Sequence, residues 1–507
     1  MKMPTKAELV RLQQLYHTDK RIAEALGGNV TEHLVQYWRR KKGIPRKQFP
    51  KYSELQIREL WERYGDDFRC GRELGLSKAG FYSWRRRYGI KERPRALKLE
   101  QLELRFGAEP KMGRNGLFVE YYRTVAEKIL ARCADIDVVE KGQQIDVTPD
   151  MLIVDPENLP GKAKIPESSD FIAKTYLITG IGIKDRKKNL SELRNIDWPF
   201  ALLRAEELQP NMLIAYTDRS SSGLSAVSSL SLKLSGSQLS DILDSGKFTI
   251  TVPSVIRLTL QGRLQKGVSA FDIFSYALSQ LSGSLTGDKL IEYSGNVVEK
   301  LDIYERISLC HLTQASGSLC GYTVFDEITR KFLSKRGKVD SKVLFSDTKA
   351  HYSSDYVLTV SGLEPHAMTV SDTIDACPVS SMTVPEEVGT VFIGGPCGGG
   401  LEQIRQVADV LKGRQVNSGT RLLVSPLTQD VYLEAMRRRF LMPIAEAGGI
   451  ILAPNTRIED ALDSKDSNVV LQTPLELDKK HPENHLFVSH LTAAESAVSG
   501  KLMPFEQ

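Results

Sequence analysis

The sequence predicts a multidomain protein in which an all-α tandem helix-turn-helix region at the N-terminus precedes a larger α/β body. An internal repeat in the first hundred residues predicts the all-α part. Further along, short apolar runs alternate with amphipathic stretches, and the apolar run Val391–Ile393 opens into a glycine-rich turn and an amphipathic segment. Strand, turn and helix in this order predict right-handed βαβ units and a parallel sheet.

The repeat has a constant offset of 46 residues, so that Thr31 matches Ser77 and Trp38 matches Trp84. Each unit is predicted to hold three short helices, of which the third follows a hydroxyl N-cap and ends at a glycine. A short helix, a glycine turn and a capped helix form a helix-turn-helix pattern. The first two helices of each unit are expected at Lys6–Tyr16 and Lys20–Leu26, and at Ser53–Tyr64 and Arg69–Leu74; Gly43 and Gly89 end the third.

Charge separates this region from the rest of the chain. Residues 1–100 hold 24 Lys and Arg against 12 Asp and Glu, a net +12, whereas the whole chain of 507 residues carries only +5. A basic block on an acidic body predicts a polyanionic partner, and we expect DNA. Base edges would be contacted from the start of the third helix and phosphates from its end. The expected DNA-binding residues are Glu32, His33, Gln36, Arg39, Arg40, Lys41, Lys42, Lys78, Arg85, Arg86 and Arg87, with Trp38 and Trp84 packed beneath.

Composition excludes several classes of protein. No apolar run is long enough to cross a membrane, and no signal peptide precedes the first amphipathic segment, so a cytoplasmic protein is expected. The six Cys, at positions 70, 133, 310, 320, 377 and 397, have no CxxC spacing, which argues against a disulfide framework or a local zinc motif. The expected divisions are repeats at 1–48 and 49–95, a linker at 96–123, two α/β domains at 124–383 and a third at 384–507.

From about Thr124 to the end, the chain resembles the large subunits of the aconitase and isopropylmalate dehydratase family. The resemblance rests on the glycine turn at 391–400, the strand leading to Asp218, and the segments 254–272, 281–287 and 308–312. It implies an aconitase-like body of three-layer α/β/α domains. In that family the turn after the strand supplies the first Cys ligand of a [4Fe–4S] cluster.

The chain departs from the family at the positions that carry chemistry. Pro396 stands at the first ligand position, Cys397 comes one residue late, and no Cys follows it. The catalytic His position is Ser220 and an active-site Glu position is Ala315. We therefore expect no cofactor, and in particular no [4Fe–4S] cluster, because the ligand positions lack Cys.

Three functions follow from this pattern. The first is a DNA-binding regulator whose catalytically degenerate, cluster-free body senses a small carboxylate or docks a protein. The alternative is an aconitase-family hydro-lyase or isomerase with an altered or rebuilt site, so enzyme activity is left open. A third is a scaffold for a separate swivel-domain small subunit; a homo-oligomer is also left open. A ligand is expected at the glycine-turn N–H groups and the Asp218 segment: Asp218, Arg219, Ser220, Ser221, Gly394, Gly395, Cys397 and Gly398.

Overall fold

A computed structural model divides the chain into two compact units, Met1–Phe118 and Val119–Gln507. The structure describes residues 3–44, 57–90 and 122–505, with gaps inside these ranges of which the longest are 62–66, 160–173, 179–193, 197–207, 462–468 and 478–483. Almost all of the expected linker at 96–123 lies outside the described residues, and the finer domain boundaries remain predictions. None of the helices that the structure describes is long and apolar enough to cross a membrane.

The first helical unit contains α1 (Lys6–Tyr16), α2 (Asp19–Leu26) and α3 (Glu32–Lys41). Apolar side chains from all three pack into one small core, which includes Trp38. The hydroxyl of Thr31 accepts the N–H of Leu34 at 3.3 Å and so caps α3 as expected.

The second helical unit repeats this arrangement in α5 (Asp67–Glu73) and α6 (Lys78–Arg87). Ser77 accepts the N–H of Gly80 at 3.1 Å, and Trp84 is half-buried against the core around Phe81. Each third helix ends before a glycine with positive φ, 64° at residue 43 and 66° at residue 89, as predicted. The assignment of these units to the helix-turn-helix class remains a prediction.

The body begins with a five-stranded, all-parallel sheet of order β4-β3-β2-β5-β6. Alternate residues of β2 face opposite sides, so Leu152 packs with the helices on one face and Ile153 with those on the other. This is the expected three-layer arrangement. The strands are β2 (Met151–Val154), β3 (Thr175–Ile178), β4 (Arg194–Ile196), β5 (Leu213–Tyr216) and β6 (Leu230–Lys233); α8 (Val125–Cys133) and α10 (Gly236–Ser245) cover one face, and η5 (Ser221–Val227), α12 (Ile303–Ala315) and α13 (Glu327–Ser334) the other.

A second parallel sheet has the order β10-β9-β8-β11, and an antiparallel ribbon pairs β1 with β7. Its elements are β8 (Ser254–Gln261), β9 (Gly287–Ser294), β10 (Ser318–Thr323) and β11 (Ser354–Thr359), with α11 (Ala270–Gln280) and η6 (Val298–Lys300) nearby; the ribbon is β1 (Gln144–Val147) and β7 (Phe248–Thr251).

The third part is a seven-stranded sheet of order β13-β12-β18-β17-β14-β15-β16, parallel from β18 to β16, which confirms the predicted βαβ units. Four helices pack against one face, with α17 and Phe392 on the other. The strands are β12 (His366–Val370), β13 (Ile374–Pro378), β14 (Val388–Ile393), β15 (Arg421–Val424), β16 (Ile450–Ile451), β17 (Val469–Gln472) and β18 (His485–Val488); the helices are η8 (Gly395–Cys397), α14 (Leu401–Leu411), α15 (Gln429–Arg437), α16 (Leu441–Glu446), α17 (Ile458–Ala461) and α18 (His490–Ser499).

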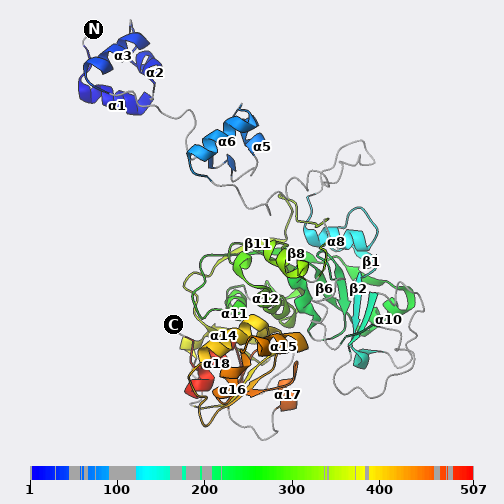
Figure 1. Ribbon diagram of the computed structural model, residues 1–507. Coiled ribbons are helices and arrows are strands. Elements are labelled where there is room, and N and C mark those ends of the chain that lie inside the picture. Colours follow the sequence, from blue (N-terminus) through cyan, green and yellow to red (C-terminus); the bar gives the residue numbers. More distant parts are fainter. Residues whose placement is uncertain are drawn as a thin grey trace. The chain divides into compact units, whose positions relative to one another are not determined.

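Helix α12 lies in the middle of the body, between the green and the yellow-to-orange parts of the chain (Figure 1). Its residues are buried on every side, although the helix carries Glu305, Arg306, Ser308 and His311. A helix buried all round must satisfy such polar groups internally. Arg306 does so by donating two hydrogen bonds to the carboxylate of Asp326, at 2.9 and 2.5 Å.

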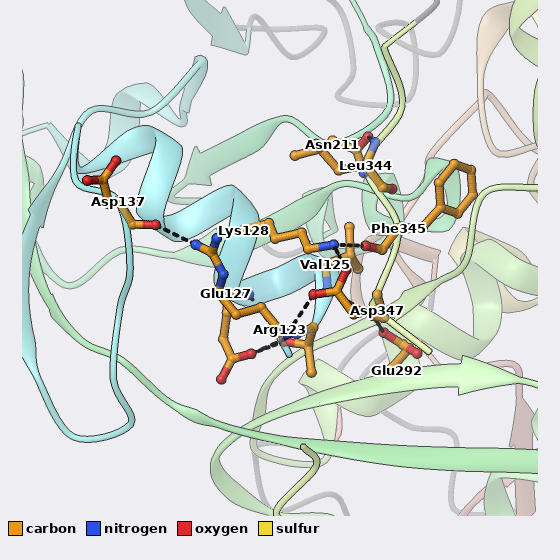
Figure 2. A network of polar contacts seen from close by, with 12 residues as sticks. Arg123, Val125, Glu127, Lys128, Asp137, Asn211, Glu292, Leu344, Phe345 and Asp347 are labelled. Atoms are coloured by element: carbon orange, nitrogen blue, oxygen red, sulfur yellow. Dashed lines mark hydrogen bonds and ion pairs between the residues drawn. The ribbon is translucent and has the colours of Figure 1, made fainter. Parts of the chain in front are cut away.

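An irregular segment, residues 343–347, which we call the strap, is hydrogen-bonded to Arg123 and to the first turns of α8 (Figure 2). Asp347 accepts the backbone N–H of Arg123 at 2.8 Å and the ammonium of Lys128 at 2.5 Å. Lys128 also donates to the carbonyl of Phe345 at 2.6 Å, and Ser346 donates to the buried carboxylate of Glu292 at 2.7 Å. These bonds hold Arg123 and the first turns of α8 to the strap.

Candidate functional site

The first expected site segment follows β5 and forms a closed turn around Asp218. Its carboxylate accepts the backbone N–H of Ser220 at 2.8 Å and of Ser221 at 3.0 Å, and both serine hydroxyls, at 2.8 and 2.5 Å. All three residues are at most 4% exposed. Burial raises the pKa of Asp218, against the lowering effect of these bonds. The side chains therefore satisfy one another and do not line an open cleft; Arg219 lies outside the described residues.

The second segment is the glycine turn between β14 and α14, and it too is closed. The N–H of Gly394 donates to Thr473 at 2.9 Å, those of Gly398 and Gly399 to the carbonyl of Gly395 at 3.4 and 2.9 Å, and that of Gly400 to Gln403. The expected free N–H groups are thus occupied at these positions. A Cβ on Gly399 would lie 2.8 Å from two backbone atoms, so the glycines serve close packing.

The two turns meet across α12. Ser222, directly after the Asp218 turn, shares a 3.0 Å hydrogen bond with Nδ1 of His311. One helical turn earlier, Ser308 donates at 2.9 Å to the carbonyl of Pro396 in the glycine turn. Both contacts are buried. The structure therefore brings together the two expected segments, with α12 as the element between them.

A further chain of polar groups ties α12 to α14 and was not foreseen. The Gln403 amide donates to Glu305 at 3.1 Å and to Ser308 at 3.0 Å, and Glu305 accepts the N–H of Ala270 at 2.5 Å. Burial raises the pKa of Glu305. The one sign available in the sequence was the spacing of Glu305, Ser308 and His311, which places them along one side of a helix otherwise rich in apolar residues.

Cys397 belongs to the core rather than to the surface of the turn. It is 2% exposed and packs in the cluster that contains Phe487 and Met368. Burial and the neighbouring charge of Glu305 raise the pKa of its thiol well above the ordinary value.

Two of the eleven expected DNA-binding residues occupy places that differ from the prediction. Arg39 is 4% exposed and donates two hydrogen bonds to Asp19, at 2.6 and 2.5 Å. Arg85 is 2% exposed and donates to Asp67 at 2.8 and 3.0 Å. Both guanidinium groups are buried and bonded to a carboxylate on the preceding helix, so that they hold α3 to α2 and α6 to α5. The expectation that Arg39 and Arg85 contact phosphates is therefore wrong for this structure.

The other expected DNA-binding residues remain available to a partner. His33, Arg40, Lys41, Lys78, Arg86 and Arg87 are exposed, and Glu32, Gln36 and Lys42 are half-buried. Gln36 donates to Glu32 at 3.4 Å. Tyr37 on α3 and Tyr82 on α6 are exposed as well, at 55% and 42%.

Comparison with known proteins decides the family of the body. A family model described as "Aconitase family (aconitate hydratase)" matches residues 202–455. This chain belongs to the aconitase family. The match spans β5 through β16 and so includes both turns and α12.

Curated relatives of the chain are named as 3-isopropylmalate dehydratase large subunits. One from Archaeoglobus fulgidus is 31% identical over 264 residues, 50% of this chain and 63% of the relative. One from Picrophilus torridus is 29% identical, over 47% of this chain and 57% of the relative, and one from Thermoanaerobacter sp. is 26% identical, over 63% and 78%. The match thus spans little more than half of some relatives. A solved structure, aconitase X of Thermococcus kodakaraensis in its holo-form, aligns over 75% of this chain and 92% of its own at 13% identity and a TM-score of 0.39.

Family membership corrects the expectation of a protein without a cofactor. The aconitase family match and the dehydratase relatives place the chain among proteins for which a [4Fe–4S] cluster is the normal cofactor. The side chains present in the described ranges do not fit that cluster at the inherited turn, because Pro396 stands at the ligand position and the Cys397 thiol points into the core. Within those ranges no three Cys, His, Asp or Glu side chains group to hold a metal.

Proposed function

We propose that the body is a hydro-lyase or isomerase acting on a small hydroxy- or unsaturated carboxylate, with a rebuilt proton-transfer group at His311. The observation that carries this proposal is the buried contact of 3.0 Å between His311 and Ser222, where the two inherited turns meet. The relatives' names point to a branched dicarboxylate such as isopropylmalate, and to a separate small subunit as partner.

The positions of the lost catalytic groups support His311. It lies one helical turn before Ala315, which stands at the family's active-site Glu position, and on the same face of α12. Its partner Ser222 comes two residues after Ser220, the position of the family's catalytic His. Imidazole is the side chain that most often moves protons in enzymes. Dehydration removes a proton from one carbon and hydroxide from its neighbour. His311 would accept the carbon-bound proton, and its imidazolium would then donate a proton to the departing hydroxide, which leaves as water.

A turnover assay tests this function. Full-length protein, purified without oxygen and assayed before and after treatment with iron and sulfide, would be offered 3-isopropylmalate, citrate and their unsaturated counterparts, alone and with a co-expressed small subunit. We expect interconversion of a hydroxy acid and its unsaturated acid. His311→Gln should lower the rate at least about 100-fold, as expected for loss of a general acid or base.

The exposed His351 provides a matched control, since His351→Gln removes an imidazole outside the buried site. Iron and sulfide content, measured on the same samples, would report a cluster independently of turnover. Absence of turnover of every substrate under all these conditions would overturn the proposal, as would equal rates for the His311 variant and the control.

A second function, nucleic-acid binding, rests on the exposed faces of α3 and α6. Arg39 and Arg85 are buried, but each helix still has two neighbouring exposed cations and an exposed tyrosine. These are Arg40, Lys41 and Tyr37 on α3, and Arg86, Arg87 and Tyr82 on α6. Such a face suits phosphates and stacked bases. We expect full-length protein to bind duplex DNA less tightly as the salt concentration rises. A variant in which Arg40, Lys41, Arg86 and Arg87 are all replaced by Gln should bind weakly, and its affinity should depend less on salt concentration. Unchanged binding by that variant would remove this function.

A further inference from the structure

The body contains a cavity of about 410 Å³, and neither the Asp218 turn nor the glycine turn contributes to its lining. Its walls come from loop 264–269 before α11, from residues 300–305 at the start of α12, and from α14, together with Leu491 and Phe505. The tail packs closely here, since a Cβ on Gly267 would lie 2.6 Å from the Phe505 carbonyl. The volume falls in the range of small-molecule sites.

Charges of both signs line this cavity in equal number. The cations are Lys266, Lys300 and Arg405, and the anions are Asp302, Glu305 and Asp409. Most are already committed to protein partners. Arg405 pairs with Glu402 and Asp409, and both oxygens of Glu305 accept hydrogen bonds.

Lys300 and Asp302, two side chains of opposite formal charge, keep unused hydrogen-bonding capacity within the described residues. Lys300 is exposed and makes no ion pair or hydrogen bond with any residue that the structure describes. Asp302 caps α12 with a single oxygen, Oδ1, which accepts the N–H groups of Tyr304 at 2.7 Å and Glu305 at 3.1 Å. Its other oxygen accepts no hydrogen bond from the described residues, and the two charges do not pair with each other.

The remaining wall is apolar and is formed by Leu264, Val268, Leu491 and Phe505. A ligand that matches all three features carries an ammonium for Asp302, a carboxylate for Lys300 and an apolar group. A polyanion would meet three carboxylates, and a simple amine would leave Lys300 without a counter-charge. Because basic and acidic side chains line the cavity in equal number, a zwitterion matches it better than an ion of one sign.

We propose that this cavity binds a free α-amino acid with an apolar side chain. The site is independent of the proposed hydro-lyase function and would persist if that function failed. Glu305, which lines the cavity, accepts a hydrogen bond from Gln403, and Gln403 also donates to Ser308, which contacts the glycine turn. Binding in the cavity is thus connected through two hydrogen bonds to the inherited site.

Calorimetric titration of the full-length protein tests the proposal. The probes are L-leucine, L-methionine, L-phenylalanine and glycine, together with 4-methylpentanoate and 3-methylbutylamine, which keep leucine's side chain but lack one charge. We expect saturable binding of the apolar amino acids and at least about 10-fold weaker binding of glycine and of both single-charge analogues.

Three variants locate the site. Lys300→Gln and Asp302→Asn should each weaken leucine binding at least about 10-fold, and the Asn retains the cap of α12, so the fold is kept. Lys247→Gln, an exposed position outside the cavity lining, should leave it unchanged. The proposal is overturned if the wild-type protein binds no amino acid at millimolar concentration, if 4-methylpentanoate binds as tightly as leucine, or if both cavity variants bind like the wild type.

Discussion

Removing Asp19 should unfold the first helical unit while leaving the body intact. Asp19 is 6% exposed and Arg39 4%, and they share two hydrogen bonds of 2.6 and 2.5 Å. Asp19→Ala leaves a buried guanidinium whose remaining hydrogen bond, among the described residues, is to the carbonyl of Ile44 at 3.5 Å. Breaking a buried pair in this way costs about 3–5 kcal/mol.

That cost is comparable with the whole stability of the unit. At roughly 0.05–0.15 kcal/mol per residue, a unit of about 40 residues is stable by only about 2–6 kcal/mol. Amide hydrogen exchange on the full-length protein is the appropriate assay, because it reports local opening. We expect peptides from α1, α2 and α3 to lose protection in Asp19→Ala, and peptides from α12 to keep it.

Two controls separate the buried ion pair from other effects. Arg40→Met removes a neighbouring exposed cation and should not change protection. Replacing Asp19 by Leu and Arg39 by Met together removes both charges and should cost little, because apolar residues of similar size can replace a buried pair. Unchanged protection of α1–α3 in Asp19→Ala would refute the reasoning. In the second unit the matching substitution is Asp67→Ala, which removes the ion-pair partner of the buried Arg85 and should destabilise that unit in the same way.

Three further outcomes follow from the body. Gly399→Ala should lower the melting temperature by overpacking, at a cost of about 1–3 kcal/mol, since its Cβ would lie 2.8 Å from backbone atoms. Gly419→Ala, with nothing nearer than 3.4 Å, should have little effect. Burial, followed by the charge of Glu305, raises the pKa of Asp302 to about 7. Wild-type stability should therefore fall relative to Asp302→Asn as pH rises from about 4 to 7, by at most about 4 kcal/mol, and a pH-independent difference in chemical denaturation would contradict this. Asp347→Ala should increase hydrogen exchange in the strap 343–347, because Lys128 and a backbone N–H lose their acceptor.

Local structure could be predicted from the sequence because it depends on local signals. The bounds expected for the first helix, Lys6–Tyr16, are those observed, and both hydroxyl caps form as predicted. Capping groups and the glycines that follow a helix act over three or four residues. The strand and helix order around the glycine turn was predictable for the same reason.

The site could not be predicted in the same way, because its contacts are distant in sequence. His311 contacts a serine 89 residues away, and Glu305 accepts hydrogen bonds from residues 35 and 98 positions away. The burial of Arg39 depends on a carboxylate 20 residues earlier. An arginine run alone does not reveal which guanidinium turns inward, although the repetition of one such position as Arg85, at the offset of the repeat, was a usable sign.

The placement of α12 explains how an inherited site can be closed and still be chemically distinctive. His311 contacts Ser222 in η5, whereas Glu305 and Ser308 hold the glycine turn through Gln403 and the Pro396 carbonyl. The contact between His311 and Ser222 joins groups that can exchange a proton. The contacts of Glu305 and Ser308 instead join α12 to α14 and the glycine turn. Glu305→Gln should therefore change stability and its pH dependence, because it removes a buried carboxylate of raised pKa. His311→Gln should instead lower the turnover rate and leave the hydrogen bonds between α12 and α14 intact. If both substitutions affected only stability, α12 would be a structural element alone and the rebuilt site would have no catalytic part.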